Sequence, residues 1–185
     1  MKKLLLIGFC VLMSIGVYAQ KGEKAIGVNL NFGTAASNVG LGVKFQYGIT
    51  DAIRIEPAVN YYFGNSSILD IGANAHYLFE VAPKIKVYPL VGLGLAMCRY
   101  EVVDMEDVHN KIEDILTSNP LDLMTSGTPE VETKHKTDVC FMANFGGGVE
   151  YAINDKFSVG LELKYAIIPG GFSQFVVGIG STYKF

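Results

Sequence analysis

The chain has 185 residues, of which 50% are hydrophobic and 18% are charged, and its formal net charge is −3. This composition excludes a disordered chain and a charged coiled coil, and the lack of a basic stripe excludes nucleic acid as a partner. After the first 20 residues no apolar run approaches the about 20 residues of a membrane-spanning helix, which excludes a helical membrane protein.

The amino terminus has the pattern of a secretory signal peptide. Lys2 and Lys3 precede an apolar stretch over residues 4–17, and Val17-Tyr18-Ala19 before Gln20 is typical of a signal-peptidase site. We therefore expect residues 1–19 to be removed on export and residues 20–185 to form one domain.

From residue 39 onward, apolar and aromatic residues occupy odd positions, while polar or small residues occupy even ones. A period of two is strand geometry, which a helix cannot produce. In the first segment the apolar residues occupy even positions instead. The pattern predicts eight strands, at about 24–33, 39–49, 53–63, 68–80, 85–100, 139–152, 157–168 and 173–185.

The connections between these segments alternate between tight turns, at 50–51, 82–83 and 154–155, and longer loops. A soluble β-sandwich or a lipocalin-like barrel also shows alternation, but its water-facing positions rarely favour glycine. Here the less apolar face carries many glycines and few charges, as the cramped interior of a small barrel does. We therefore predict an all-β fold, an eight-stranded antiparallel transmembrane β-barrel.

If odd positions from Val39 onward face lipid, five cations and five anions face the interior. They are Lys44, Arg54, Lys86, Lys164 and Lys184 against Glu56, Asp70, Glu80, Glu150 and Glu162. Hairpin symmetry places Lys44 opposite Glu56 and Glu80 near Lys86. Because buried charges are tolerated only when paired, an ion-pair plug is favoured over a gated channel or a proton-linked pore.

His76 also falls on an inward position. It is interpreted as part of the hydrogen-bonded filling, although a titrating switch, or a metal ligand together with Asp70, is the alternative. No cofactor is expected.

Cys98 and Cys140 are the cysteines that remain after removal of the signal peptide. Both fall on inward positions of adjacent antiparallel segments, and a hairpin centred at residue 119 would place them opposite one another. They form either a disulfide, favoured by passage through an oxidising periplasm, or two buried thiols.

Residues 101–138 form the predicted long outside loop, with ten acidic residues and three lysines. Asp104 is a suitable helix N-cap, and apolar residues recur at helical spacing until Ser118-Asn119-Pro120, which predicts one short amphipathic helix. This helix could cover the barrel mouth, lie on the membrane surface or bind an extracellular ligand or protein. The acids match no calcium or zinc spacing, so no metal site is expected there.

Over residues 20–185 the chain resembles the small outer-membrane barrels of the OmpA/OmpX type. It is most similar to the "outer membrane protein beta-barrel domain" proteins of Bacteroidetes-type bacteria, through Tyr47-Gly48-Ile49-Thr50-Asp51 and the Ala19-Gln20 junction. The resemblance implies a bacterial outer-membrane location in contact with lipid. It also implies that the terminal segment, with Tyr183 and Phe185, is the sorting signal for the barrel-assembly machinery.

The resemblance leaves three classes of function open. The favoured one is a closed barrel with a structural or surface-interaction role, and the alternative is a narrow porin-like channel for small solutes. A lipid-modifying enzyme is the remote alternative. It needs an activated serine beside a histidine and an acid, and no outward His-x-Ser arrangement occurs, so we expect no catalysis.

Overall fold

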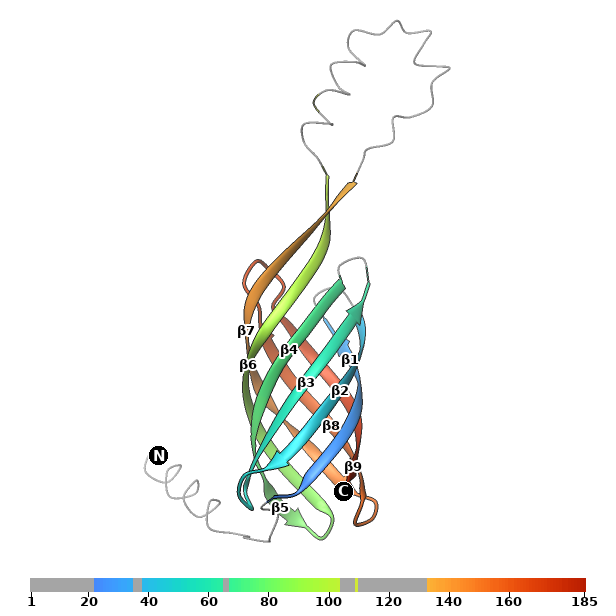
Figure 1. Cartoon of the computed structure of the whole chain (residues 1–185), viewed down its shortest axis with the longest axis vertical. Coiled ribbons are helices and arrows are strands. Elements are labelled where there is room, and N and C mark those ends of the chain that lie inside the picture. Colours follow the sequence, from blue (N-terminus) through green and yellow to red (C-terminus); the bar gives the residue numbers. More distant parts are fainter. Residues whose placement is uncertain (1–21, 35–37, 65–66, 104–108, 110–132) are drawn as a thin grey trace, which may run out of the picture.

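A computed structural model describes residues 22–34, 38–64, 67–103, 109 and 133–185. The described chain is almost entirely strand and closes into a barrel (Figure 1). The strands are β1 (Lys24–Gly33), β2 (Asn38–Gly48), β3 (Ile53–Phe63), β4 (Ser67–Tyr77), β5 (Phe79–Ala82), β6 (Ile85–Val103), β7 (Thr133–Ala152), β8 (Phe157–Ile167) and β9 (Gln174–Lys184).

The barrel has eight strands because β4 and β5 are two parts of one interrupted strand. All neighbouring strands pair antiparallel, β1 pairs with β9, and a β4–β6 pairing closes the ring. The interruption lies at Leu78, whose N–H donates to the carbonyl of Ala52. Beyond it β5 pairs with β6. The predicted fold class is therefore confirmed.

The strands β1–β4, β8 and β9 present apolar side chains outward and bury many of the alternate positions. Val28, Val91 and Ile179 are each more than 60% exposed, whereas Asn31, Glu56 and Asn74 are less than 5% exposed. A soluble protein would bury its apolar face, so this inside-out distribution identifies the outer wall as a lipid-facing surface. No helix among the described residues is long and apolar enough to cross a membrane.

The longest hairpin corrects the predicted boundaries of the outside loop. Strand β6 continues to Val103 and β7 begins at Thr133, so pairing runs without a break into the predicted loop at both of its ends. The two strands project beyond the barrel as a twisted ribbon, at the end opposite the carboxy terminus (Figure 1). The predicted helix lies, apart from His109, outside the described residues, as does the signal peptide.

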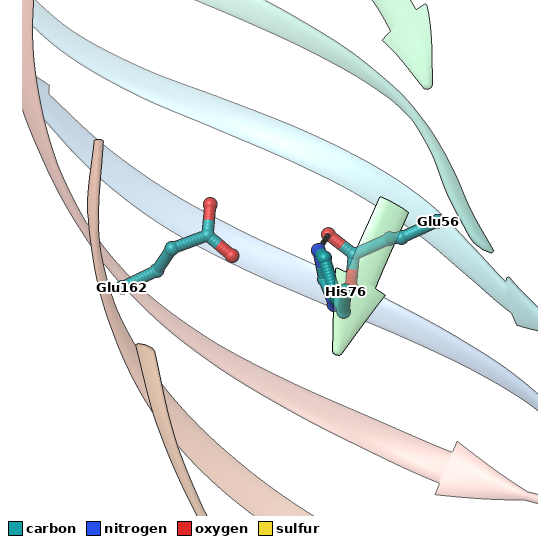
Figure 2. Close-up of side chains that lie close together, drawn as sticks. All are labelled: Glu56, His76 and Glu162. Carbon is teal, nitrogen blue, oxygen red and sulfur yellow. Dashed lines mark ion pairs between the residues drawn. The ribbon is translucent and has the colours of Figure 1, made fainter. Parts of the chain in front are cut away.

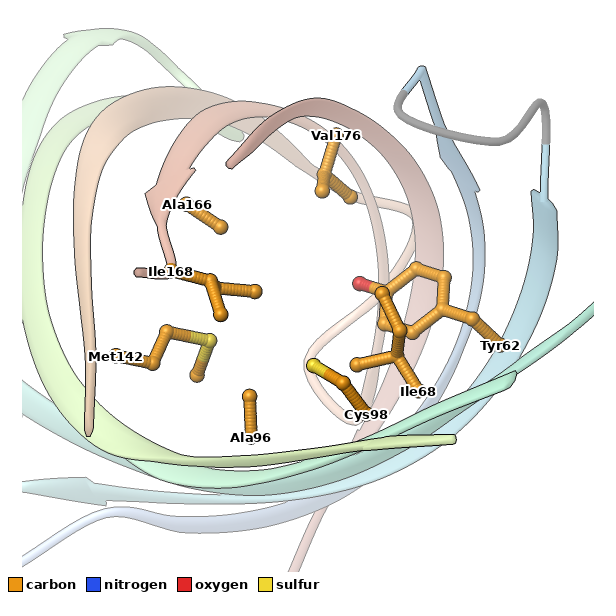
Figure 3. Packing of buried hydrophobic residues seen from close by; sticks show 8 residues of the cluster. All are labelled: Tyr62, Ile68, Ala96, Cys98, Met142, Ala166, Ile168 and Val176. Atoms are coloured by element: carbon orange, nitrogen blue, oxygen red, sulfur yellow. The ribbon is translucent and has the colours of Figure 1, made fainter. Parts of the chain in front are cut away.

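The barrel interior has an apolar layer near the end that carries the ribbon, which we call the apolar plug. It consists of Tyr62, Ile68, Ala96, Cys98, Met142, Ala166, Ile168 and Val176, with Phe172 packed against it (Figure 3). Between this layer and the other end the interior is mainly polar, apart from a smaller buried cluster of Leu78, Tyr88 and Leu90. Glycines make room for the polar side chains: a Cβ at Gly42 would collide with the amide oxygen of Asn60.

Candidate functional site: a polar network inside the barrel

Glu56 of β3 is the first node of the interior network. Its Oε2 lies 3.1 Å from Lys44 Nζ and accepts a hydrogen bond from Gln46 Nε2 at 2.6 Å. The register, however, places Lys44 opposite Ala58 rather than Glu56, so the expected pairing was displaced by two residues. The long lysine side chain reaches the carboxylate diagonally across the two strands.

Arg54 is the second node and links its own strand, β3, to three others. Its Nη1 donates to Glu150 Oε2 at 2.7 Å and to Gln46 Oε1 at 3.1 Å, while Nε donates to Nδ1 of His76 at 3.3 Å. The guanidinium carbon also lies 5.2 Å from the centre of the Tyr88 ring. The buried cation is thus matched by a carboxylate, as its desolvation requires.

His76 of β4 is buried between these nodes. Its ring stacks on Tyr88 with centroids 4.5 Å apart, and its Nε2 lies 4.0 Å from Glu56 Oε1. Glu56, His76 and Glu162 each offer one atom that lies within 4.8 Å of the other two (Figure 2). Among the described residues, this is the group that could hold a metal ion, and it does not include Asp70, the partner considered from the sequence.

A second part of the network lies closer to the apolar plug. Asn60 donates to Asp70 Oδ1 at 2.6 Å and accepts from Asn29 and Asn31 at 2.7 and 2.9 Å. Lys164 Nζ lies 3.7 Å from Glu162 Oε1, and Tyr88 donates to Glu162 Oε2 at 3.5 Å. These contacts pair Lys164 with Glu162, while the Asp70 carboxylate accepts a hydrogen bond from the Asn60 amide.

Glu80 and Lys86 lie outside this core. They are opposite one another in the β5–β6 hairpin, but Glu80 is exposed and Lys86 is only half-buried. The expected Glu80–Lys86 register is confirmed, but Glu80 is not part of the buried network, because β5 lies at the end of the barrel beyond the interruption at Leu78. At the same end Lys184 Nζ lies 2.7 Å from Glu23 Oε1.

The two cysteines are not bonded. Cys98 lies opposite Asp138 and Cys140 opposite Ala96, and both thiols are free. The centre of the β6–β7 hairpin lies one residue earlier in the chain than expected. The residue opposite each cysteine is therefore two positions away from the other cysteine. The disulfide is therefore replaced by two thiols, of which Cys98 is buried in the apolar plug.

Tyr183 and Phe185, the residues of the expected sorting signal, lie at the end of β9. The Tyr183 ring contacts the Phe157 ring with centroids 4.9 Å apart. Phe185 is 69% exposed on the lipid side, while its N–H donates to the carbonyl of Lys24.

The β6–β7 ribbon carries a separate polar cluster above the barrel. Tyr100 donates to Asp138 Oδ2 at 2.7 Å, and Lys136 Nζ lies 3.6 Å from the same oxygen. The hydrogen bond to Asp138 raises the pKa of Tyr100, because the protonated phenol is the donor. The Tyr100 ring also contacts Phe172, which links the ribbon to the β8–β9 loop.

The sequence analysis missed two contributors to the interior. Tyr88 and the apolar plug occupy inward positions, where polar or small residues were expected. Large residues at even positions, such as Tyr62, Ile68, Met142 and Ile168, were the available signal.

Comparison with known proteins places this geometry among membrane barrels. Residues 7–185 match the sequence model of a family described as "Outer membrane protein beta-barrel domain". The structure is similar to the N-terminal β-barrel domain of Pseudomonas aeruginosa OprF, with 16% identity, a TM-score of 0.58, and coverage of 89% of this chain and 98% of that one.

Two further solved barrels have comparable similarity. Neisserial surface protein A shares 13% identity at a TM-score of 0.57, covering 88% of this chain and 96% of that one. Ail, the attachment invasion locus protein of Yersinia pestis, shares 11% identity at a TM-score of 0.53, covering 90% and 100%. At these identities the similarity establishes the fold alone. No curated protein sequence matches the chain.

Proposed function

Because the chain belongs to the outer membrane protein beta-barrel domain family, whose place is the bacterial outer membrane, we propose that it is a closed barrel with a structural or surface-interaction role. The membrane lipid surrounds its outer wall. The interior supports the barrel and does not conduct, and the ribbon with its connecting loop presents the interaction surface.

One observation carries the closed-barrel proposal: the interior is filled by paired side chains. Two cavities that border charged interior residues have volumes of about 10 Å³ each. This is about the minimum that one water molecule needs, far below a continuous aqueous path.

The apolar plug supports the same conclusion for the end that carries the ribbon. Its members are at most 3% exposed. An apolar constriction excludes water and hence hydrated ions. A solute would therefore have to displace both this layer and the network below it.

The ribbon supports the interaction role. From Thr133 to Met142, one side of β7 is paired with β6. The other side pairs with β8 only from Ala143 onward. An unpaired strand edge offers backbone donors and acceptors to another chain. The acidic segment that connects the two strands adds a surface that favours basic partners.

Single-channel recording in planar bilayers tests the proposal. We expect refolded protein to give no steady conductance, whereas steady unitary currents would favour the narrow-channel alternative. A variant with residues 104–132 replaced by a short Gly-Ser linker should remain folded and silent. Loss of binding to cells or matrix protein in this variant would assign the interaction to the loop.

The described residues give no positive evidence of catalysis. His76 is enclosed in the barrel and engaged by Arg54, while His109 and His135 are exposed. Assay of purified protein for deacylation and acylation of lipid A tests the enzyme alternative, and we expect no turnover.

A further inference from the structure

We propose that Glu56, His76 and Glu162 form a binding site for one water molecule, and that this site rejects divalent metal ions. The three side chains come from β3, β4 and β8 and converge inside the barrel (Figure 2). A cluster of one histidine and two carboxylates would ordinarily suggest a metal centre, but its hydrogen bonding and its dimensions both favour water.

The tautomer of His76 follows from its neighbour Arg54. Two guanidinium nitrogens, Nε and Nη2, lie 3.3 and 3.1 Å from His76 Nδ1. Arginine can only donate hydrogen bonds, so Nδ1 must be the acceptor. In a neutral imidazole the proton is then on Nε2, which makes Nε2 a donor.

This Nε2–H donor has no hydrogen-bond partner among the described residues, and His76 is 1% exposed. Its nearest carboxylate oxygen is Glu56 Oε1, at 4.0 Å, which is too long for a direct hydrogen bond. Because a buried donor without a partner is costly, the site calls for an acceptor between the ring and the carboxylates.

The carboxylates of Glu56 and Glu162 can accept hydrogen bonds from a molecule placed between them and the ring. Glu56 uses Oε2 for Lys44 and Gln46, which leaves Oε1 turned toward His76. Glu162 has only long contacts, at 3.5 Å to Tyr88 and 3.7 Å to Lys164. A water molecule here would accept from His76 Nε2 and donate one hydrogen to each glutamate.

The distances within the cluster also favour a water molecule over a metal ion. Three atoms that all lie within 4.8 Å of one another have a common point no more than about 2.8 Å from each, which is a hydrogen-bond length. Two ligands of a tetrahedral zinc ion, each at about 2.0–2.2 Å, lie about 3.4 Å apart. His76 Nε2 and Glu56 Oε1 are 4.0 Å apart, so these side chains would have to close in to bind zinc. A cavity of about 10 Å³, lined by Glu56 and Glu162 but not by His76, lies on the carboxylate side of the cluster. Its volume is about the minimum that a single water molecule needs.

Metal coordination is opposed by the chemistry as well. A metal ion binds the unprotonated nitrogen of an imidazole, and here that nitrogen faces Arg54. Coordination by Nε2 would move the proton to Nδ1, where it would point at the guanidinium. Lys44 and Lys164 add positive charge beside the carboxylates that a cation would need.

The inferred water connects the two parts of the network. Glu56 belongs to the cluster of Lys44, Gln46 and Arg54, and Glu162 to that of Tyr88 and Lys164. The water bridges these clusters across the interior.

Nuclear magnetic resonance of the full mature barrel, refolded in nanodiscs and labelled with nitrogen-15 at histidine, tests the inference. We expect His76 to show the Nε2–H tautomer, with an exchange-protected proton and a cross-relaxation peak to a long-lived water. An Nδ1–H tautomer, or a protected Nε2 proton without any water peak, would overturn the proposal.

Titration with zinc chloride tests the rejection of metal. The exposed His109 and His135 serve as internal controls, because zinc can reach them. We expect their signals to shift while those of His76 stay unchanged, including in samples refolded with zinc present. A stoichiometric zinc shift at His76 that persists in an H109Q/H135Q variant would replace the water site by a metal site.

A pair of variants locates the acceptor. Glu162→Gln keeps a carbonyl acceptor and should retain the water peak, whereas Glu162→Met should lose it while the barrel remains folded. If Glu162→Met does not fold, Glu56→Gln and Glu162→Gln should both keep the water peak, and its loss in both would contradict the site. If the Met variants fold, retention of the peak in both Glu162→Met and Glu56→Met would contradict the site.

Discussion

Arg54 and Glu150 meet across the barrel interior with 2.7 Å between Nη1 and Oε2, although they come from β3 and β7, which are not neighbours in the sheet. Both side chains are nearly inaccessible to solvent. The ion pair therefore ties opposite parts of the wall, in addition to the hydrogen bonds between adjacent strands.

Removal of one partner of this pair should strongly destabilise the barrel. Arg54→Met leaves Glu150 as an uncompensated buried charge, which costs about 3–5 kcal/mol in the free energy of unfolding. Urea unfolding of refolded protein in micelles measures this loss. The double variant R54M/E150M should recover much of it, and equal destabilisation of the single and double variants would contradict the assigned pairing.

The apolar plug should contribute to stability through packing. Ile168 is 1% exposed inside the barrel, whereas its neighbour Ile167 is 44% exposed toward lipid. Ile168→Ala should therefore lower the free energy of unfolding by about 2–4 kcal/mol through the cavity that it creates. Ile167→Ala, which removes the same atoms from the lipid-facing side, is the matched control, and a loss as large as that of Ile168→Ala would contradict the packing role.

Phe185 should affect assembly more than stability. The resemblance to outer-membrane barrels implies that the terminal aromatic residue is read as a sorting signal, and its side chain contributes little to the interior. Phe185→Ser should reduce the outer-membrane yield far more than the stability of refolded protein. Phe175→Ser removes another lipid-exposed phenylalanine and serves as control; similar losses of yield in both variants would leave only an interfacial role for Phe185.

The mature protein should contain two free thiols. Alkylation under denaturing conditions without reductant, followed by mass spectrometry, should add two labels, at Cys98 and Cys140. In the folded barrel Cys98 should react more slowly, because it is buried and Cys140 is not fully so. Recovery of unlabelled, linked peptides would reinstate the disulfide expected from the sequence.

Tyr100 should ionise at higher pH than an ordinary tyrosine, because the hydrogen bond to Asp138 raises its pKa. The stabilisation of the ribbon by this bond is complete below the unfolded-state pKa of about 10 and is lost as pH rises through the folded-state value. Ultraviolet titration of the protein minus that of Tyr100→Phe isolates this phenol. Asp138→Asn should lower the pKa, and an unchanged difference spectrum would rule out the assigned cause.

The strand positions were predictable because the period of two is visible in the sequence itself. The apolar outward residues of β8 and β9 are one example, and the bounds of β1 and β3 agree with the predicted ranges. The cross-strand partners were predicted less well, because the centre of a hairpin depends on the conformation of its turn. Glu80 does lie opposite Lys86, but the partners of Lys44 and of the two cysteines differ from those expected. In the β2–β3 turn Thr50 Oγ1 accepts hydrogen bonds from the N–H groups of Ala52 and Ile53, and the first pair beyond it is Gly48 with Arg54.

The sequence allowed the residues of the interior site to be predicted, but not which of them contact one another. The alternation of odd and even positions alone assigned Glu56, His76 and Glu162 to the barrel interior. Their convergence depends on the closure of the barrel, which brings β8 toward β3 and β4, and no local pattern contains that information. Likewise the interruption at Leu78, which moves Glu80 to the barrel end, depends on a backbone hydrogen bond to Ala52.

The continued pairing of β6 with β7 acts as a spacer. The last pair of β6 with β4 is at Arg99, and β6 then continues from Tyr100 to Val103, which at about 3.4 Å per residue adds about 14 Å of strand length. The attachment points of the acidic segment therefore stand clear of the rim of the barrel. Under the proposed surface-interaction role, a large partner could reach these attachment points without approaching the lipid headgroups.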